Sequence, residues 1–393
     1  MLDTQRLPAA LYAALQDDLR VALAAEGLDA VIADHPDDVA YLTGFFHHPN
    51  ERPAVVLLSQ EGPTLLLVPE LEREYALAQH AAAEVVAYPE FPGLRPPLHY
   101  LGAAAETGRA RRLGYSGDLT VDRLDQVRAA FPSATLVRSE VVMHARYVKR
   151  PEEVALHAEA ARITDLMLVA GRALVEEALS AGGSLPSEAE IAAHIGRVGT
   201  STMYADHAEV VVVSFLAGGL VYSGANSARP HALPSGHRLR PGETFMLSLG
   251  CAVGGRFVEG ERTFILGEPS ADQRRYYEAV REAQAVGGAA LRPGVPCSEA
   301  NRICLDVIRD AGLGQFLRHR QGHGIGLGMH EAPWLSDGDD TPLAAGMVVS
   351  NEPGIYIPGH AGYRISDSML ITEDGARPFT SYPRAFDDIV IPV

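Results

Sequence analysis

Five short polar segments in the C-terminal part of this chain constrain its fold more than its composition does. Most of them combine an acid, a histidine or a serine with glycine or proline. They read Ser248-Leu249-Gly250-Cys251, Glu259-Gly260-Glu261-Arg262-Thr263, Gly322-His323-Gly324-Ile325-Gly326, Asn351-Glu352-Pro353-Gly354 and Arg364-Ile365-Ser366-Asp367. One such segment arises easily by chance, whereas five in a fixed order do not. Together they point to one particular architecture.

The five segments closely resemble the metal-bearing motifs of the pita-bread peptidases, which include methionine aminopeptidase, aminopeptidase P and prolidase. The companion pairs Pro230-His231 and His330-Glu331 match as well. The resemblance is close from about residue 150 to residue 393 and looser before that. It implies an α/β N-terminal domain, which we place at residues 1–148, and an α+β pita-bread C-terminal domain at residues 149–393.

The ligand positions of that family read differently in this sequence. Relatives hold two divalent ions with Asp, Asp, His, Glu and Glu, whereas the matching residues here are Ser248, Glu259, His323, Glu352 and Ser366. Because a neutral serine hydroxyl is a poor ligand for hard divalent ions, we expect no two-metal site. The expectation is therefore no cofactor, or at most one divalent ion (manganese, zinc or iron) on Glu259, His323 and Glu352.

Part of the sequence is similar to creatinase, a metal-free branch of the same fold that hydrolyses a C-N bond of a guanidino compound. The similarity lies in Leu247–Cys251 and the following Glu261-Arg262-Thr263. It implies that His231 moves the proton and that Glu261 and Glu352 bind a guanidinium cation. Two carboxylates suit a planar cation, and a histidine near neutrality can take up and return a proton. Creatine itself is not expected as the substrate, because no arginine follows His330 where creatinase has one.

Three further residues acquire roles through the resemblance. His330 matches a histidine that stabilises the tetrahedral intermediate in the peptidases. Arg52 and Arg364 could each hold a substrate carboxylate through two hydrogen bonds. Arg52 matches a position from which relatives reach into the active site of a neighbouring subunit, so the resemblance also implies a homodimer.

These observations leave three functions open. The leading hypothesis is a metal-independent, creatinase-like hydrolase that cleaves a C-N bond in a small amino-acid-like or guanidino substrate. The first alternative is an Xaa-Pro dipeptidase or aminopeptidase P-like enzyme that uses a single metal and takes a dipeptide. The second is a non-catalytic protein that uses the old cleft to bind a ligand.

Composition excludes some partners. The formal charge of -17 argues against a nucleic acid or an anionic membrane surface as the partner, since both require concentrated positive charge. The spacing of Cys251, Cys297 and Cys304 fits neither a metal site nor a disulfide framework, which favours a reducing, cytoplasmic location. No stretch approaches the roughly 20 apolar residues of a membrane span.

Periodicity and capping signals predict the main elements. Proline at a first helical position and two following acids predict a helix from Pro151, and Ser187-Glu188-Ala189-Glu190 is a capping box. Four consecutive valines predict a buried strand over residues 210–215. The remaining predictions are helices over residues 9–25, 271–290 and 298–311, and strands over residues 30–33, 54–58, 64–68 and 244–249.

Overall fold

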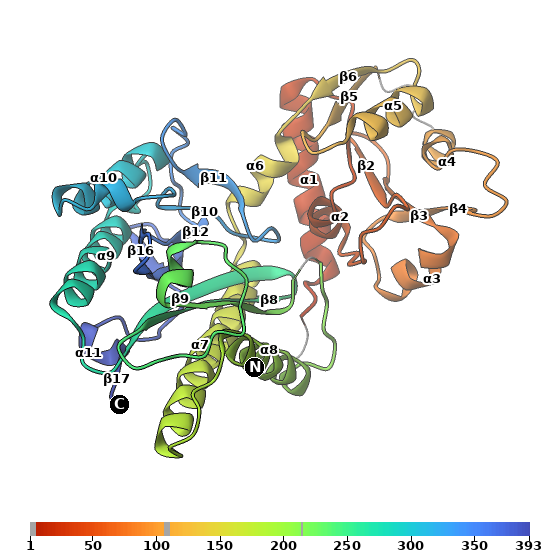
Figure 1. The fold of residues 1–393 in the computed structure, drawn as a ribbon. Helices are drawn as coiled ribbons and strands as arrows, with labels where there is room; N and C mark the ends of the chain where they lie inside the picture. The colour runs from red at the N-terminus through yellow and green to blue at the C-terminus, as the bar shows by residue number, and fades with distance from the viewer. Residues whose placement is uncertain (1–4, 106–110, 214) are drawn as a thin grey trace. The chain divides into compact units, whose positions relative to one another are not determined.

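The computed structural model describes residues 5–105, 111–213 and 215–393, which form two compact units (Figure 1). The N-terminal unit contains Arg6–Arg146 and the segment that begins at Val211. The C-terminal unit contains Gln5, Tyr147–Val210 and Phe215–Val393. Each unit has its own sheet and its own buried core, as expected for a chain too long for one core.

The N-terminal unit is built on a mixed sheet in the order β4-β3-β2-β1-β5-β6. β1 pairs antiparallel with β2 and parallel with β5, so the sheet combines a meander with crossover connections. The strands are β1 (Ala30–Ala33), β2 (Val55–Ser59), β3 (Thr64–Pro69), β4 (Glu84–Tyr88), β5 (Arg112–Tyr115) and β6 (Thr135–Arg138). The helices are α1 (Ala9–Glu26), α2 (Pro36–Thr43), α3 (Glu70–Ala78), α4 (Leu98–Ala104), α5 (Val121–Ala130) and α6 (Val141–Tyr147).

Helices cover this sheet because its central strands are apolar on both faces. All of the residues of β1, β2 and β3 are buried. Ile32 and Leu57 belong to a core cluster with Leu98 and Leu101 of α4 and Val127 of α5. Strands that are apolar throughout are typical of α/β domains, and the predicted α/β class of this unit is confirmed.

The C-terminal unit is built on a curved sheet in the order β11-β10-β12-β15-β9-β8-β7, with β16 beside β15 and β17 beside β9. The long hairpin of β8 (Thr244–Val253) and β9 (Arg256–Leu266) turns at the glycine pair 254–255, both with positive φ. The other strands are β7 (Ala217–Ser223), β10 (Gly322–Gly324), β11 (Glu331–Leu335), β12 (Val348–Asn351), β15 (Ser366–Ile371), β16 (Ala376–Pro378) and β17 (Val390–Ile391), with a separate hairpin of β13 (Gly354–Ile357) and β14 (Ala361–Arg364).

Long helices pack on one face of this sheet. Figure 1 shows α7 beside α8 and α9 beside α10, and these pairs are in contact. A side chain added at Gly260 of β9 would meet Thr164 of α7, and Asp367 of β15 bonds to Gln284 of α9. The helices are α7 (Pro151–Ser180), α8 (Glu188–Asp206), α9 (Ala271–Ala290), α10 (Cys297–Asp310) and the short α11 (Phe386–Ile389), with 3-10 turns at Gly224–Ala228 and Gly314–Phe316. We call the helix-covered side the closed face and the other side, which carries Glu259, Glu261 and Ser366, the open face. The predicted pita-bread class of this unit is confirmed.

Local signals placed most of these elements correctly, with one error. α7 begins at Pro151 and α8 follows the capping box of Ser187 and Glu190, as predicted. The strand predicted over residues 210–215 is wrong for its described part, and residue 214 lies outside the described residues. Val211 and Val213 are buried but do not belong to a strand, and the β7–β8 ladder begins only at Ala217. Among the described helices, none is both long and apolar enough to cross a membrane.

Candidate metal centre

Four neighbouring strands bring the polar residues of the sequence motifs onto the open face of the C-terminal sheet. Glu259 and Glu261 lie two residues apart on β9, so both side chains point to the same face. Ser248 of β8 and Ser366 of β15 are the cross-strand partners of Glu261 on its two sides. β10, which carries His323, pairs with β12, and β12 pairs with β15, so His323 belongs to the same sheet.

Glu259, His323 and His330 converge at one point. Each offers a ligand atom, and these three atoms lie within 4.8 Å of one another. The rings of His323 and His330 have centroids 4.0 Å apart. Nε2 of His323 lies 3.2 Å from a carboxylate oxygen of Glu352 and 3.8 Å from one of Glu259. A carboxylate and two imidazoles, with a second carboxylate beside them, form a donor set that suits a divalent metal ion.

Nε2 of His323 is buried and faces two carboxylates. The side chain is 1% exposed, and among the described residues Nε2 makes no hydrogen bond of good geometry, so its contact with Glu352 is an ion pair that requires a protonated ring. Its other ring nitrogen, Nδ1, lies 3.0 Å from the carbonyl oxygen of Gly324, which orients the ring. Metal-binding histidines are commonly held in this way, with the second nitrogen bonded to a carbonyl. The residues present therefore fit a metal ion at this position.

Burial and mutual charge shift the pKa values of this group in opposite directions. Burial raises the pKa of Glu259 to about 8, and the negative charge of Glu352 adds to the effect. Burial alone would lower the pKa of His323, but Glu352 and Glu259 outweigh it and raise it to about 9. Burial would raise the pKa of Glu352, but His323 holds it below its usual value. Burial lowers the pKa of His330 to about 4. In the protein without metal, a protonated His323 thus pairs with Glu352, while Glu259 is an acid that is difficult to ionise.

Glu261 and Arg364 form a second, separate cluster on the same face. Nη2 of Arg364 donates to a carboxylate oxygen of Glu261 over 2.7 Å, and Nε pairs with the other oxygen. Nη2 also lies 3.0 Å from the hydroxyl of Ser248, and Nη1 donates to the hydroxyl of Tyr356 over 3.0 Å. Burial opposes the charge of Arg364, but Glu261 keeps the pKa of Arg364 well above its usual value. The two charges therefore neutralise each other inside the protein.

The serines at the two altered ligand positions are hydrogen-bond donors in the structure. The hydroxyl of Ser366 donates to Glu259 over 2.7 Å, and that of Ser248 donates to Glu261. Each serine thus contacts a carboxylate of the neighbouring strand β9. Hydrogen bonds of this kind fix the rotamers of Glu259 and Glu261.

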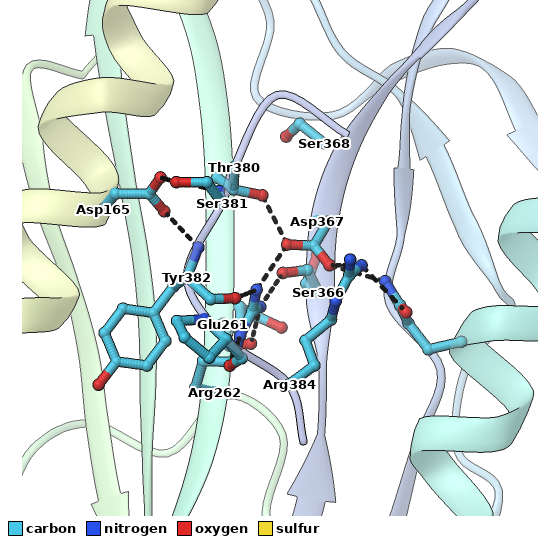
Figure 2. A network of polar contacts seen from close by, with 12 residues as sticks. Asp165, Glu261, Arg262, Ser366, Asp367, Ser368, Thr380, Ser381, Tyr382 and Arg384 are labelled. Atoms are coloured by element: carbon cyan, nitrogen blue, oxygen red, sulfur yellow. Dashed lines mark hydrogen bonds and ion pairs between the residues drawn. The ribbon is translucent and has the colours of Figure 1, made fainter. Parts of the chain in front are cut away.

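The closed face of the same strands carries a contrasting cluster around Asp367. Figure 2 shows its carboxylate between Thr380, Arg384 and the buried Arg262. One oxygen accepts from Arg262 over 2.8 Å and from Thr380 over 2.6 Å; the other accepts from Gln284 over 2.7 Å and from Arg384 over 2.8 Å. This carboxylate is fully satisfied by the protein itself.

The structure brings together most of the predicted site residues, but not all of them. His231 is exposed on the turn after the Gly224–Ala228 helix, and its charge contributes to the lowered pKa values of His319 and His330. Arg52 belongs to the N-terminal unit, where it pairs with Glu51 and Glu90. The predicted roles of His231 and of Arg52 stay predictions.

Known proteins share this fold and sequence over nearly the whole chain. Residues 155–373 match the Metallopeptidase family M24, and residues 16–148 match the Creatinase/Prolidase N-terminal domain. This chain belongs to metallopeptidase family M24. An Xaa-Pro dipeptidase from Lactobacillus delbrueckii subsp. lactis is 32% identical over 93% of this chain and 96% of its own length.

Solved structures agree with this M24 assignment. The dipeptidase PepE from Mycobacterium ulcerans superposes with a TM-score of 0.85 at 28% identity, covering 99% of this chain and 100% of that one. The prolidase from Pyrococcus horikoshii OT3 superposes with a TM-score of 0.81 at 26% identity, covering 95% and 99%. The resemblance to pita-bread peptidases is therefore confirmed, and the peptidase alternative is favoured over the creatinase-like hypothesis.

Membership in M24 corrects the cofactor prediction. We expected no cofactor, or at most one divalent ion, because serine replaces two carboxylates. That expectation is wrong: the family is a metallopeptidase family, and the structure groups Glu259, His323 and His330 around one point. The motifs alone did not identify His330 as a potential metal ligand. His330 follows a turn, and the sequence does not define where that turn places its side chain.

Sequence reasoning also missed several residues around this M24 site. His319 lies 2.8 Å from the hydroxyl of Tyr356, which in turn contacts Arg364. Tyr222 lies 3.5 Å from Arg364 on its other side. One available signal was the spacing of Glu259 and Glu261, since residues two apart on a strand share a face. No local signal links Arg364 to Glu261, because they are 103 residues apart.

Proposed function

We propose that this protein is a metal-dependent dipeptidase that hydrolyses Xaa-Pro dipeptides. The observation that carries the proposal is the convergence of Glu259, His323 and His330, with the buried Nε2 of His323 facing the carboxylates of Glu259 and Glu352. An Xaa-Pro dipeptidase and a prolidase, which align with 93% and 95% of this chain, support the substrate class.

Glu259, His323 and His330 would hold divalent metal at this centre. The chemistry that a bound divalent ion supplies in such a site is polarisation of the scissile carbonyl and activation of a water molecule. Glu352 lies beside this group, 3.2 Å from His323, and is placed to accept the proton of the attacking water. Water oxygen bonds to the carbonyl carbon, the C-N bond breaks, and Glu352 returns the proton to the departing prolyl nitrogen.

The Glu261–Arg364 pair supports a peptidase over a guanidino hydrolase. A carboxylate that binds a substrate guanidinium has to be available in the free protein, and Glu261 already binds the guanidinium of Arg364 through both oxygens. Breaking this buried pair to admit another cation would be costly. Binding of the substrate carboxylate by Arg52 or Arg364, a homodimer and a cytoplasmic location stay predictions.

The test compares Leu-Pro with Leu-Ala as substrates, with manganese, zinc or iron added and with chelator. We expect Leu-Pro to be hydrolysed preferentially, the activity to disappear in chelator, and His323→Ala to abolish it. His194→Ala, on α8 and outside the site, is the control and should retain full activity. Turnover of a guanidino compound in chelator, with no hydrolysis of Leu-Pro under any condition, would refute the proposal.

A further inference from the structure

A cavity of about 370 Å³ lies on the closed face of the C-terminal sheet, behind the metal centre. Its walls come from α9, the ends of β12 and β16, β15 and the segment before α11. Arg281, Gln284, Asn351 and Arg384 supply its polar lining, and Met369 and Pro378 supply apolar walls. Its size is at the small end of the range for small-molecule sites.

The guanidinium groups at this cavity have unused donors. Arg384 uses Nη1 for Asp367 and Gln284, and Arg281 uses Nε for Glu278. Within the part of the chain that the structure describes, Nε and Nη2 of Arg384 and both terminal nitrogens of Arg281 make no hydrogen bond. Guanidinium groups with free N–H donors bind carboxylate and phosphate oxygens well.

The local charge balance also favours an anion. The two lining arginines, Arg281 and Arg384, pair with Glu278 and Asp367, and Asp367 also pairs with Arg262, which does not line the cavity. Among these five groups one positive charge is in excess. Asp367 does not repel a ligand strongly, since four donors already share its charge (Figure 2).

We propose that this cavity binds a small oxyanion, a carboxylate or a phosphate, between Arg281 and Arg384. The site is separate from the metal centre but backs directly onto it. Met369 of β15 lines the cavity, and consecutive strand residues point to opposite faces, so Ser366 and Ser368 point away from it. The anion would thus sit behind β12 and β15, which lie in the sheet between β10 with His323 and β9 with Glu259.

The test is calorimetric titration of the metal-loaded protein with inorganic phosphate and, separately, with succinate, at constant ionic strength. We expect saturable binding of one anion per chain, weakened roughly tenfold by Arg281→Gln, because a hydrogen bond to a charged group is lost. Tighter binding of phosphate would assign the site to phosphate compounds, and tighter binding of succinate to carboxylates. The melting temperature should rise with the bound anion, since only the folded state binds it.

Arg275→Gln is the matched control. Arg275 is on the same helix and also pairs with a carboxylate three residues earlier, Asp272, but it does not line the cavity. The Arg275→Gln variant should bind the anion with the same affinity as the wild type. The proposal is overturned if neither anion binds saturably, if Arg281→Gln binds as well as the wild type, or if binding is lost in His323→Ala and kept in Arg281→Gln, which would place the anion at the metal centre.

Discussion

Two buried carboxylates on opposite faces of one sheet have opposite surroundings. Asp367 is 0% exposed and accepts hydrogen bonds from four side chains, two of them arginines. Glu259 is 7% exposed and its side chain accepts one, from Ser366. The hydrogen bonds and ion pairs of the fold fully satisfy Asp367. Glu259 instead lies beside His323 and Glu352, and burial with the charge of Glu352 raises its pKa to about 8, so its charge is poorly compensated when it ionises.

The difference separates a structural role from a functional one. A buried charge that is fully hydrogen-bonded and paired contributes to one defined native structure. A buried charge left without compensation is costly, and it is retained where a ligand completes it. On this basis Glu259 belongs to the metal centre and Asp367 to the scaffold, although only a short distance along the strands separates them.

The largest expected effect is the loss of activity in Glu259→Gln. Gln keeps the size of the side chain and can still accept from Ser366, but it cannot supply a charged ligand. We expect kcat/KM on Leu-Pro to fall by roughly a thousandfold or more, because metal-assisted catalysis contributes several kcal/mol. Bound metal, measured by elemental mass spectrometry, should fall in parallel. Stability in urea with chelator should not decrease. A variant that keeps its metal and its rate would contradict the assignment.

The matched change on the closed face, Asp367→Asn, should act on stability instead. It leaves Arg262, whose side chain is 0% exposed, without its carboxylate. Removing one partner of a buried ion pair costs about 3–5 kcal/mol. Urea denaturation in the presence of chelator measures this loss. A loss of stability below about 1 kcal/mol would mean that the ion pairs of Asp367 do not have the structural role assigned to them.

A third prediction concerns His157 of α7, a buried group that is kept neutral rather than paired. Burial, with the charges of Lys149 and Arg256, lowers its pKa to about 3, and the charge of Glu153 opposes this only in part. In the unfolded chain the pKa returns to about 6.5, so the unfolded state binds the proton first. Its contribution to stability is present above pH 6.5 and is lost as the pH falls toward 3.

His157→Gln tests this dependence. Urea denaturation across this pH range should give a slope of stability against pH that is smaller in the variant by up to about 1.4 kcal/mol per pH unit. His194→Gln, at a half-buried position of α8, is the control for the His-to-Gln change itself. Equal slopes for His157→Gln and the wild type would show that His157 does not titrate on unfolding.

The smallest effects should come from two hydroxyl groups that bond to the two carboxylates. Thr380→Val removes a donor from Asp367 and should cost about 1–2 kcal/mol of stability, with kcat unchanged. Ser366→Ala removes the donor to Glu259 and should instead change the metal affinity, by roughly tenfold. Denaturation curves and metal titrations of both variants compare the two faces directly. An equal loss of stability in Thr380→Val and Ser366→Ala would contradict the distinction between a structural Asp367 and a metal-binding Glu259.

Local sequence signals predicted much of the fold. α9 spans the predicted residues because Ser270 and Gln273 cap it reciprocally. α10 ends at Asp310, one residue before the predicted end and two before Gly312, which has φ of 72°. The valine run failed because apolar β-branched residues also occur in extended segments without a sheet partner. Whether such a run pairs depends on strands far away in the chain, which no local pattern specifies.

The candidate site was predictable in part for the same reason. Motif matching found Glu259, His323, Glu352 and the two serines, because their sequence neighbours are distinctive. It did not find that Arg364 pairs with Glu261, nor that Asp367 is surrounded by Arg262, Gln284, Thr380 and Arg384, since these partners meet only in the folded sheet. Charges in a sequence can be counted, but their compensation is a property of the fold.

The closed-face cluster has a further consequence for β15. A slip of this strand by one residue would turn Asp367 into the metal centre and Ser366 toward the helices, since side chains alternate along a strand. Such a slip would separate Asp367 from Arg262, Thr380 and Gln284 at once. The contacts of Asp367 therefore help to fix the register that places Ser366 opposite Glu261. A buried acid on the closed face thus determines which side chains of β15 reach the metal centre.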